Sequence, residues 1–237
     1  MSLKTGWWCF ELPGYRPHAE IATYSLFSYE DLPPIDAPTD PSFTWLRTQP
    51  AYEHSLADGC YTDGTAPDLV KPWSTLLTQL THDLPASFTT FIQTPELHQR
   101  ICSCTECYLE LPDFIVPTSY PKNGILIHFL SDQQWILHWY LYVDPLDNNW
   151  VFVSPKAFGF QWFDFTEEGN AADNQLSAAI NLHDEPIWLC APTFTDFIYR
   201  YWLENELWFT LIRKKLTLTP VQQAYVEHYG SSALITP

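Results

Sequence analysis

The most informative stretch of the sequence runs from residue 125 to residue 154 and reads ILIHFLSDQQWILHWYLYVDPLDNNWVFVS. Runs rich in β-branched and aromatic residues, at 125–130, 135–143 and 150–154, are separated by turn formers, which is the pattern of a strand meander. In the run 135–143 apolar side chains occupy both alternating sets of positions, as in a strand buried on both faces. We therefore predict an antiparallel meander with residues 135–143 near its centre.

The sequence outside this stretch predicts further strands and several helices. Strands are expected at 108–116 and 187–190, and turns at Asn123-Gly124 and 147–149. Apolar spacing of three and four residues predicts a helix that begins after Pro72 and ends before Pro85, and another through Phe88, Phe91 and Ile92. Capping signals predict further helices from Thr94 toward Arg100, after Thr195 and Asp196, and from Thr219 to Gly230. Together these elements predict a single α+β domain, with an antiparallel or mixed sheet of about four to six strands flanked by N- and C-terminal helices.

The first part of the chain has a different character. Between residues 30 and 72 it is rich in proline and shows no sustained period of either kind, so residues 1–72 are expected to be irregular. Phe43, Trp45 and Leu46 are large apolar residues within it and indicate that it packs on the body. We therefore divide the chain into a Pro-rich segment, 1–72, and an α+β part, 73–237.

The charge of the chain restricts its partners. Eleven Lys and Arg stand against 28 Asp and Glu, which gives a formal net charge of −17. Such a charge repels the phosphate backbone, so we expect no binding to nucleic acid. It favours encounter with a basic protein, although solubility alone explains an acid surplus equally well.

No apolar run approaches the ~20 residues that a membrane helix needs, and residues 1–17 lack the pattern of a signal peptide. We therefore expect a cytoplasmic protein that does not bind membranes. In that compartment the six cysteines are expected to stay reduced, without a structural disulfide.

The cysteines at Cys102, Cys104 and Cys107 are the most unusual local feature. Three thiols this close can converge on Zn²⁺ if the chain turns, with His98 or Cys60 as the fourth ligand. The paired Cys-x-x-Cys spacing of a strong zinc signal is absent. Small buried side chains at a helix-to-strand junction are the alternative, and a redox role is a further one.

Two histidines on neighbouring predicted strands are the other candidates for chemistry. His128 and His138 could face each other across a hairpin with Asp132 near its turn, as an acid–base or metal-binding pair would. Buried, hydrogen-bonded histidines are the alternative reading. Glu204 and Glu206 lie two apart on the long helix, so they cannot pair and are expected to be solvated. No nucleophile elbow, P-loop, dinucleotide or zincin motif occurs.

The residues Leu84, Pro85, Phe88 and Phe91, followed by the strand meander and C-terminal helices, resemble the SUKH superfamily over roughly residues 73–229. Members of this family include a yeast regulator of cell-wall synthesis and many bacterial immunity proteins. In the family, a Leu-Pro followed by an aromatic residue opens a short helix before a mixed sheet. The resemblance implies a non-enzymatic domain that binds another protein, such as a toxin that must be blocked in the producing cell.

Aromatic residues beside acidic ones are candidate partner contacts, since interface hot spots favour Trp and Tyr. The preferred set is Trp162, Phe163, Asp164, Phe165, Glu167 and Glu168; a second set is Trp7, Trp8, Phe10 and Tyr15. Core packing is the alternative for both. The sequence thus favours a protein-binding module for a basic partner, with no cofactor. An enzyme without a local motif and a zinc-stabilised interaction domain remain as alternatives.

Overall fold

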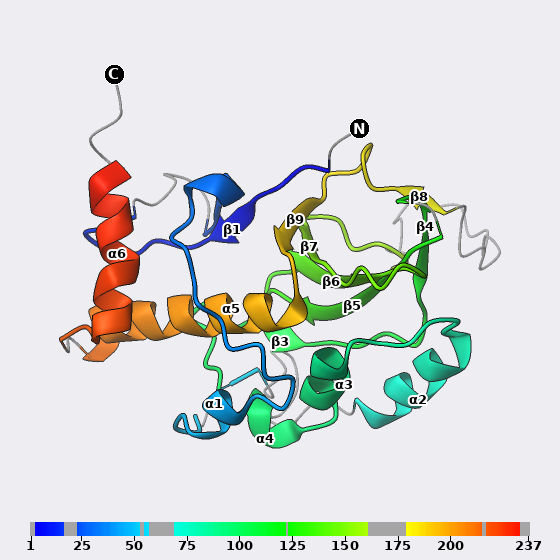
Figure 1. Ribbon diagram of the computed structural model, residues 1–237, viewed down its shortest axis with the longest axis horizontal. Coiled ribbons are helices and arrows are strands. Elements are labelled where there is room, and N and C mark those ends of the chain that lie inside the picture. The colour runs from blue at the N-terminus through cyan, green and yellow to red at the C-terminus, as the bar shows by residue number, and fades with distance from the viewer. Residues whose placement is uncertain are drawn as a thin grey trace, which may run out of the picture.

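The computed structural model describes residues 3–16, 23–52, 55–56, 69–121, 123–160, 179–214 and 217–232. In this part of the chain one mixed sheet has the strand order β8-β4-β5-β6-β7-β9, and β3 pairs with β5 beside β4 (Figure 1). The strands are β3 (Tyr108–Leu109), β4 (Val116–Tyr120), β5 (Ile125–Ser131), β6 (His138–Val143), β7 (Val151–Ser154), β8 (Ile180–Asn181) and β9 (Trp188–Ala191). The α+β prediction is confirmed.

The β6 strand lies at the centre of the sheet, between β5 and β7, and all of its residues are buried. This position confirms the prediction drawn from its two apolar faces. The strand starts at His138 and not at Trp135, however, because the β5–β6 turn occupies the intervening residues. The Trp135 backbone has a φ of 60° and donates to the Asp132 carbonyl at 2.9 Å, so it cannot extend the ladder.

The predicted strand 108–116 is two strands, β3 and β4, which pair with different ends of β5. At the β4–β5 turn, Asn123 takes a φ of 61°, and a Cβ on Gly124 would lie 2.2 Å from the Tyr142 ring. Only glycine fits at this close approach, which agrees with the predicted Asn-Gly turn. The mixed character of the sheet comes from β8, which runs parallel to β4.

The predicted helices are present with shifted ends. They are α2 (Val70–Gln79), α3 (Ala86–Ile92), α4 (Pro95–His98), α5 (Phe194–Trp208) with a π-helical extension η2 (Phe209–Lys214), and α6 (Pro220–Ser232). Thr193, and not Thr195, caps α5: its hydroxyl accepts from the Asp196 amide at 3.1 Å. The capping box predicted for α6 is confirmed, because Thr219 and Gln222 bond each other's backbone amide reciprocally.

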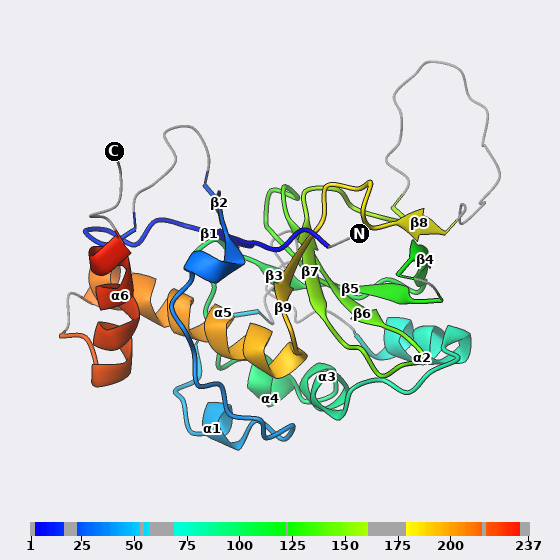
Figure 2. The same cartoon turned by 45° about the horizontal axis from the view of Figure 1, so that its top comes forward.

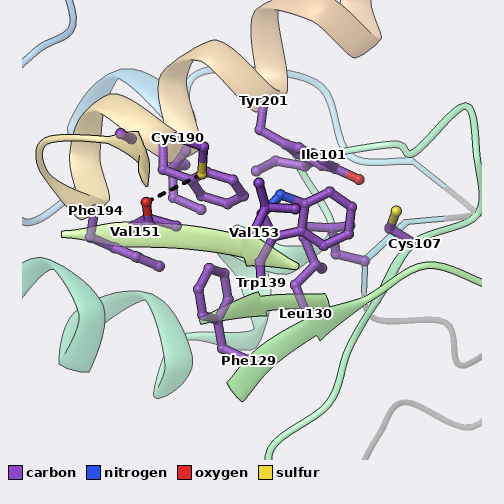
Figure 3. Packing of buried hydrophobic residues seen from close by; sticks show 14 of the residues in the cluster. Ile101, Cys107, Phe129, Leu130, Trp139, Val151, Val153, Cys190, Phe194 and Tyr201 are labelled. Carbon is purple, nitrogen blue, oxygen red and sulfur yellow. Dashed lines mark hydrogen bonds between the residues drawn. The ribbon is translucent and has the colours of Figure 1, made fainter. Parts of the chain in front are cut away.

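The main core lies between one face of the sheet and helices α3 and α5. Phe129 of β5 packs edge-on against Phe88 of α3 at 5.8 Å and Phe194 of α5 at 5.4 Å between ring centroids. Figure 3 shows Phe129 and Phe194 with Trp139 and Tyr201 in this core. A smaller cluster, which includes Tyr140, Tyr142 and Phe158, covers the other face. Each face of the sheet is thus buried, as the strand composition requires.

The N-terminal part contributes β1 (Trp7–Cys9), β2 (Ser25–Phe27), η1 (Tyr29–Asp31) and α1 (Thr44–Arg47). Its residues Trp7, Phe43 and Leu46 belong to the main core, so the described parts of 1–72 and 73–237 share one hydrophobic core. Between η1 and α1 the chain crosses α5 on its outer side (Figures 1 and 2). None of the described helices has the length and apolar character of a membrane span.

Candidate functional site

The predicted histidine pair is part of a buried polar cluster on the sheet, which we call the Ser131 cluster and which consists of Glu110, His128, Ser131 and His138. The β5–β6 register pairs Ser131 with His138, and the two histidine ring centroids are 5.4 Å apart. The Ser131 hydroxyl lies 2.8 Å from Glu110 Oε2, 3.0 Å from His128 Nε2 and 3.1 Å from His138 Nδ1. The sequence pattern thus located two of the four members.

Carbonyl partners fix the tautomers of both rings. His138 Nε2 donates to the Trp135 carbonyl at 3.1 Å, so the Nδ1 of a neutral His138 is an acceptor that needs the Ser131 hydrogen. If the Ser131 hydroxyl donates to His138 Nδ1, its hydrogen is no longer free for Glu110. Glu110 can then bond Ser131 only by donating to it, which requires a protonated carboxyl group. If Glu110 is ionised it takes the Ser131 hydrogen, and His138 can then bond Ser131 only as an imidazolium. Glu110 and His138 therefore compete through Ser131 for one proton.

The environment of the cluster favours its neutral forms. Burial raises the pKa of Glu110, against the opposing effect of the Ser131 hydrogen bond. Burial lowers the pKa of His138 to about 4, and burial together with His138 lowers the pKa of His128 to about 3. Both histidines and Ser131 are at most 2% exposed, whereas Glu110 is half-buried. The alternative reading, buried and hydrogen-bonded histidines, is what the structure shows for these two side chains.

Asp132 does not join the Ser131 cluster. Its carboxylate instead accepts from the Tyr24 hydroxyl at 2.7 Å and from the Gln134 amide at 2.9 Å, where it holds the turn. Glu110 takes the place expected for an acid. Its backbone amide donates to the Phe129 carbonyl, an extension of the short β3–β5 pairing. The sequence gives no local signal for that pairing, because its two strands are joined through β4.

The prediction that Glu204 is solvated is wrong. Glu204 is 1% exposed and forms a bidentate pair with Arg16, with its oxygens 2.7 and 3.0 Å from the two guanidinium nitrogens. Tyr225 of α6 and Trp7 of β1 also donate to it. Burial opposes its charge, but Arg16 outweighs burial and holds the pKa of Glu204 below its usual range. The pair joins the N-terminal strand, α5 and α6.

The candidate zinc ligands lie at and near the cysteine-rich turn. His98 is 3% exposed and uses Nε2 to donate to the Phe91 carbonyl at 2.7 Å. Cys107 is buried beside the Tyr24 hydroxyl at 3.5 Å, whereas Cys102 and Cys104 are half-buried. Within the described ranges, no three His, Cys, Asp or Glu side chains gather as metal ligands. Cys60 lies outside the described residues.

A partly exposed aromatic group lies where α1 meets α5. Trp45 of α1 contacts Tyr199 and Trp202 of α5, with ring centroids 5.2 and 5.1 Å apart, and the two α5 rings are 5.8 Å apart. All three side chains are half-buried. We call this group the aromatic face.

The chain that leads to α1 is acidic. Residues 29–40, here called the acidic strap, contain Glu30, Asp31, Asp36 and Asp40 and no lysine or arginine. The first three are exposed, while Asp40 accepts from the Ser42 and Thr44 amides at 2.9 Å and so fixes the start of α1. Asp36 of this strap is the exposed carboxylate that lies near Tyr199 of the aromatic face, where, after burial, it contributes to raising the pKa of the Tyr199 hydroxyl.

The preferred partner set, Trp162, Phe163, Asp164, Phe165, Glu167 and Glu168, lies outside the described residues, so that prediction stands as it was. In the second set, Trp7 and Phe10 are buried in the core, and Trp8 packs on Trp188 at 5.6 Å. Core packing thus explains most of the second set. Neither set includes the aromatic face, whose members come from distant parts of the chain.

The motif that resembles the SUKH superfamily opens α3. Pro85 is the N-cap residue, and Phe88 and Phe91 are fully buried against the sheet and α5. Comparisons with protein-family models, with curated proteins and with solved structures found no match. The resemblance therefore stays a prediction.

Proposed function

We propose that this chain is a non-enzymatic, intracellular protein-binding module for a basic partner, as in an immunity protein that neutralises a basic toxin. The observation that carries the proposal is the acidic strap lying beside the half-buried aromatic face. Negative potential steers a basic protein to its site, and aromatic side chains supply the contact area that holds it.

The arrangement of the polar groups supports binding over chemistry. His128, Ser131 and His138 of the Ser131 cluster are buried, and so are Arg16 and Glu204. Side-chain hydrogen bonds link the members within each of the two groups. Polar networks of this kind specify a packed core. The surplus of acids is on the surface, at residues such as Glu30, Asp31 and Asp36. The groups available to another molecule are thus the charged and aromatic ones.

Affinity capture tests the proposal. The purified chain, immobilised, is incubated with lysate of its own cells at about 0.1 M and about 0.5 M salt, because screening at the higher concentration weakens exposed charge contacts. We expect a protein of high isoelectric point to be retained at the lower salt only. The captured protein is then purified and its affinity measured directly.

The immunity reading has its own measurement. Expression of the captured protein alone should arrest growth, and co-expression of this chain should restore it. Retention of acidic or neutral proteins with no dependence on salt would overturn the basic-partner proposal. A captured basic protein that is harmless when expressed alone would remove the toxin and leave the binding function.

The enzyme alternative is tested at Ser131. A fluorophosphonate probe reacts with activated serine nucleophiles, and we expect no labelling, because Ser131 is 0% exposed. Labelling that disappears in Ser131→Ala would shift the assignment to acyl-transfer chemistry at the Ser131 cluster. Labelling that persists in that variant would point to another serine.

A further inference from the structure

The aromatic face has the features of a site for a cation. Trp45 makes T-shaped contacts with Tyr199, inclined by 74°, and with Trp202, inclined by 65°, and each of the three side chains keeps part of its surface exposed. The face of an aromatic ring is electron-rich and attracts a guanidinium or ammonium group. The Trp45 and Trp202 indole nitrogens are buried and have no hydrogen-bond partner, so the exposed part of these two side chains is apolar ring surface.

Negative charge lies next to these rings without a matching cation. Asp36 is exposed and near enough to Tyr199 that, after burial, it is the cause that raises the pKa of the Tyr199 hydroxyl. The nearest arginine in sequence, Arg47, donates from Nε to the Ser42 carbonyl at 3.2 Å. Arg16 and Arg200 are buried in the network around Glu204 and Tyr225. Arg200 also lies over the ring of Tyr29, the first residue of the strap, with its guanidinium carbon 5.9 Å from the ring centroid. Among the described residues, no basic side chain forms a salt bridge with Asp36.

We propose that the aromatic face, together with Asp36 of the acidic strap, is the docking surface for arginine side chains on the partner protein. This inference rests on the proposed function and adds the surface and the side chain recognised. Arginine fits better than lysine because its planar guanidinium stacks on aromatic rings while it donates to a carboxylate.

Charge complementarity selects this occupant over others. A second copy of the chain would bring a further net charge of −17 to an acidic surface, which opposes self-association here. Nucleic acid is repelled for the same reason. A basic protein is attracted to the same field, and its arginines reach both the rings and the carboxylates.

A titration with a peptide of ten arginines tests the surface. Isothermal titration at low salt compares the wild-type chain with Tyr199→Ala and Asp36→Asn. The matched control is Asp147→Asn, which removes the same charge from an exposed residue in the β6–β7 turn. A peptide of ten citrullines, which lacks the charge, controls for the shape of the side chain.

We expect Tyr199→Ala and Asp36→Asn each to weaken arginine-peptide binding by about threefold or more, as the loss of an exposed cation–π or charge contact implies. Asp147→Asn should bind as the wild type does, and all variants should keep the wild-type melting temperature within a few degrees. A peptide of ten lysines should bind more weakly than the arginine peptide.

The outcomes separate the two proposals. Equal weakening by Asp36→Asn and Asp147→Asn would show that overall charge binds the peptide, which overturns this surface and leaves the basic partner. Lysine binding as tight as arginine binding would overturn the choice of side chain. A wild-type chain that binds no basic peptide even at low salt would count against the proposed function itself.

Discussion

Ser131 has one hydroxyl hydrogen and two neighbours, Glu110 and His138, that can accept it. Because Ser131 is buried, the stability of the fold depends on which neighbour receives this hydrogen. An acceptor without a donor in the protein interior costs free energy. Burial raises the pKa of Glu110, against the opposing effects of the hydrogen bonds from Ser131 and Tyr108.

The shared Ser131 hydroxyl predicts unequal losses of stability for two substitutions. Ser131→Ala leaves both neighbours without their shared partner and should lower the free energy of unfolding by about 1–3 kcal/mol. Glu110→Gln should cost less, about 0.5 kcal/mol, because the amide of glutamine has both an oxygen that can accept from Ser131 and a nitrogen that can donate to it. Urea denaturation at neutral pH measures both. A larger loss of stability for Glu110→Gln than for Ser131→Ala would contradict the role of Ser131 as the shared hydrogen-bond partner.

Helix α5 joins the parts of the molecule through its buried face. Glu204 of this helix pairs with Arg16 from the N-terminal part and accepts from Tyr225 of α6 at 2.7 Å. Arg16 also donates to the Phe10 carbonyl and to the Tyr229 hydroxyl. One carboxylate thus ties three segments that are far apart in sequence, and its loss would leave a buried guanidinium without a counter-charge.

We therefore expect Glu204→Gln to lower the free energy of unfolding by about 3 kcal/mol or more, as the breaking of buried ion pairs does. Glu206→Gln is the matched control on the same helix: Glu206 is half-buried and accepts from the Tyr52 hydroxyl, and its loss should cost about 1 kcal/mol or less. Chemical denaturation of both variants makes the comparison. Equal losses in the free energy of unfolding for the two variants would mean that the Arg16–Glu204 ion pair stabilises the fold no more than the Glu206 contact does.

The β4–β5 turn brings Gly124 against the ring of Tyr142 on β6. A Cβ at Gly124 would lie 2.2–2.4 Å from two ring atoms and the hydroxyl oxygen of Tyr142, and Tyr142 is fully buried, so the ring has little room to move. We expect Gly124→Ala to destabilise the fold by about 1–3 kcal/mol through overpacking. Gly14→Ala is the comparison, with open space around its Cβ but a φ of 82° that alanine tolerates poorly.

If Gly124→Ala melts at the wild-type temperature, the close approach to Tyr142 is relieved without cost and the reading of this turn is wrong. Addition of Tyr142→Phe to Gly124→Ala should recover part of the loss, because it removes the hydroxyl oxygen that lies 2.4 Å from the new Cβ. Thermal melts of the single and double variants measure this coupling.

The stability of the whole molecule should depend on pH through its buried histidines. Burial lowers the pKa of His98 and His138 to about 4 and, with His138 as a second cause, that of His128 to about 3. A histidine in an unfolded chain titrates near ~6.5. Between pH ~6.5 and ~4 the unfolded chain therefore binds protons that the folded protein does not, so stability falls as the pH falls.

Each histidine should contribute a slope of up to about 1.4 kcal/mol per pH unit in this window. Urea denaturation at several pH values measures the total, and His98→Asn, which removes one of these histidines, should reduce the slope. A free energy of unfolding that stays flat between pH ~6.5 and ~4 would mean that the histidines are protonated in the folded state.

Local pattern was enough for much of the fold. The two apolar faces of β6, the Asn123-Gly124 turn and the Thr219–Gln222 capping box are properties of adjacent residues, and all three are present as predicted. For the candidate sites the pattern located His128 and His138, since neighbouring strands bring their residues together. It missed Glu110 and Ser131, which join them through a non-local strand pairing and a single shared hydroxyl.

Hydrophobic period, turn residues and caps act over a few residues, so the central strand meander, the helices after residue 72 and the acid surplus are readable from the chain alone. The sequence does not show whether a given carboxylate is solvated or buried. Glu204 and Arg16 stand 188 positions apart, and the aromatic face joins Trp45 to Trp202. Only the folded arrangement decides such contacts, because burial and pairing depend on which distant side chains the packed helices and strands bring together.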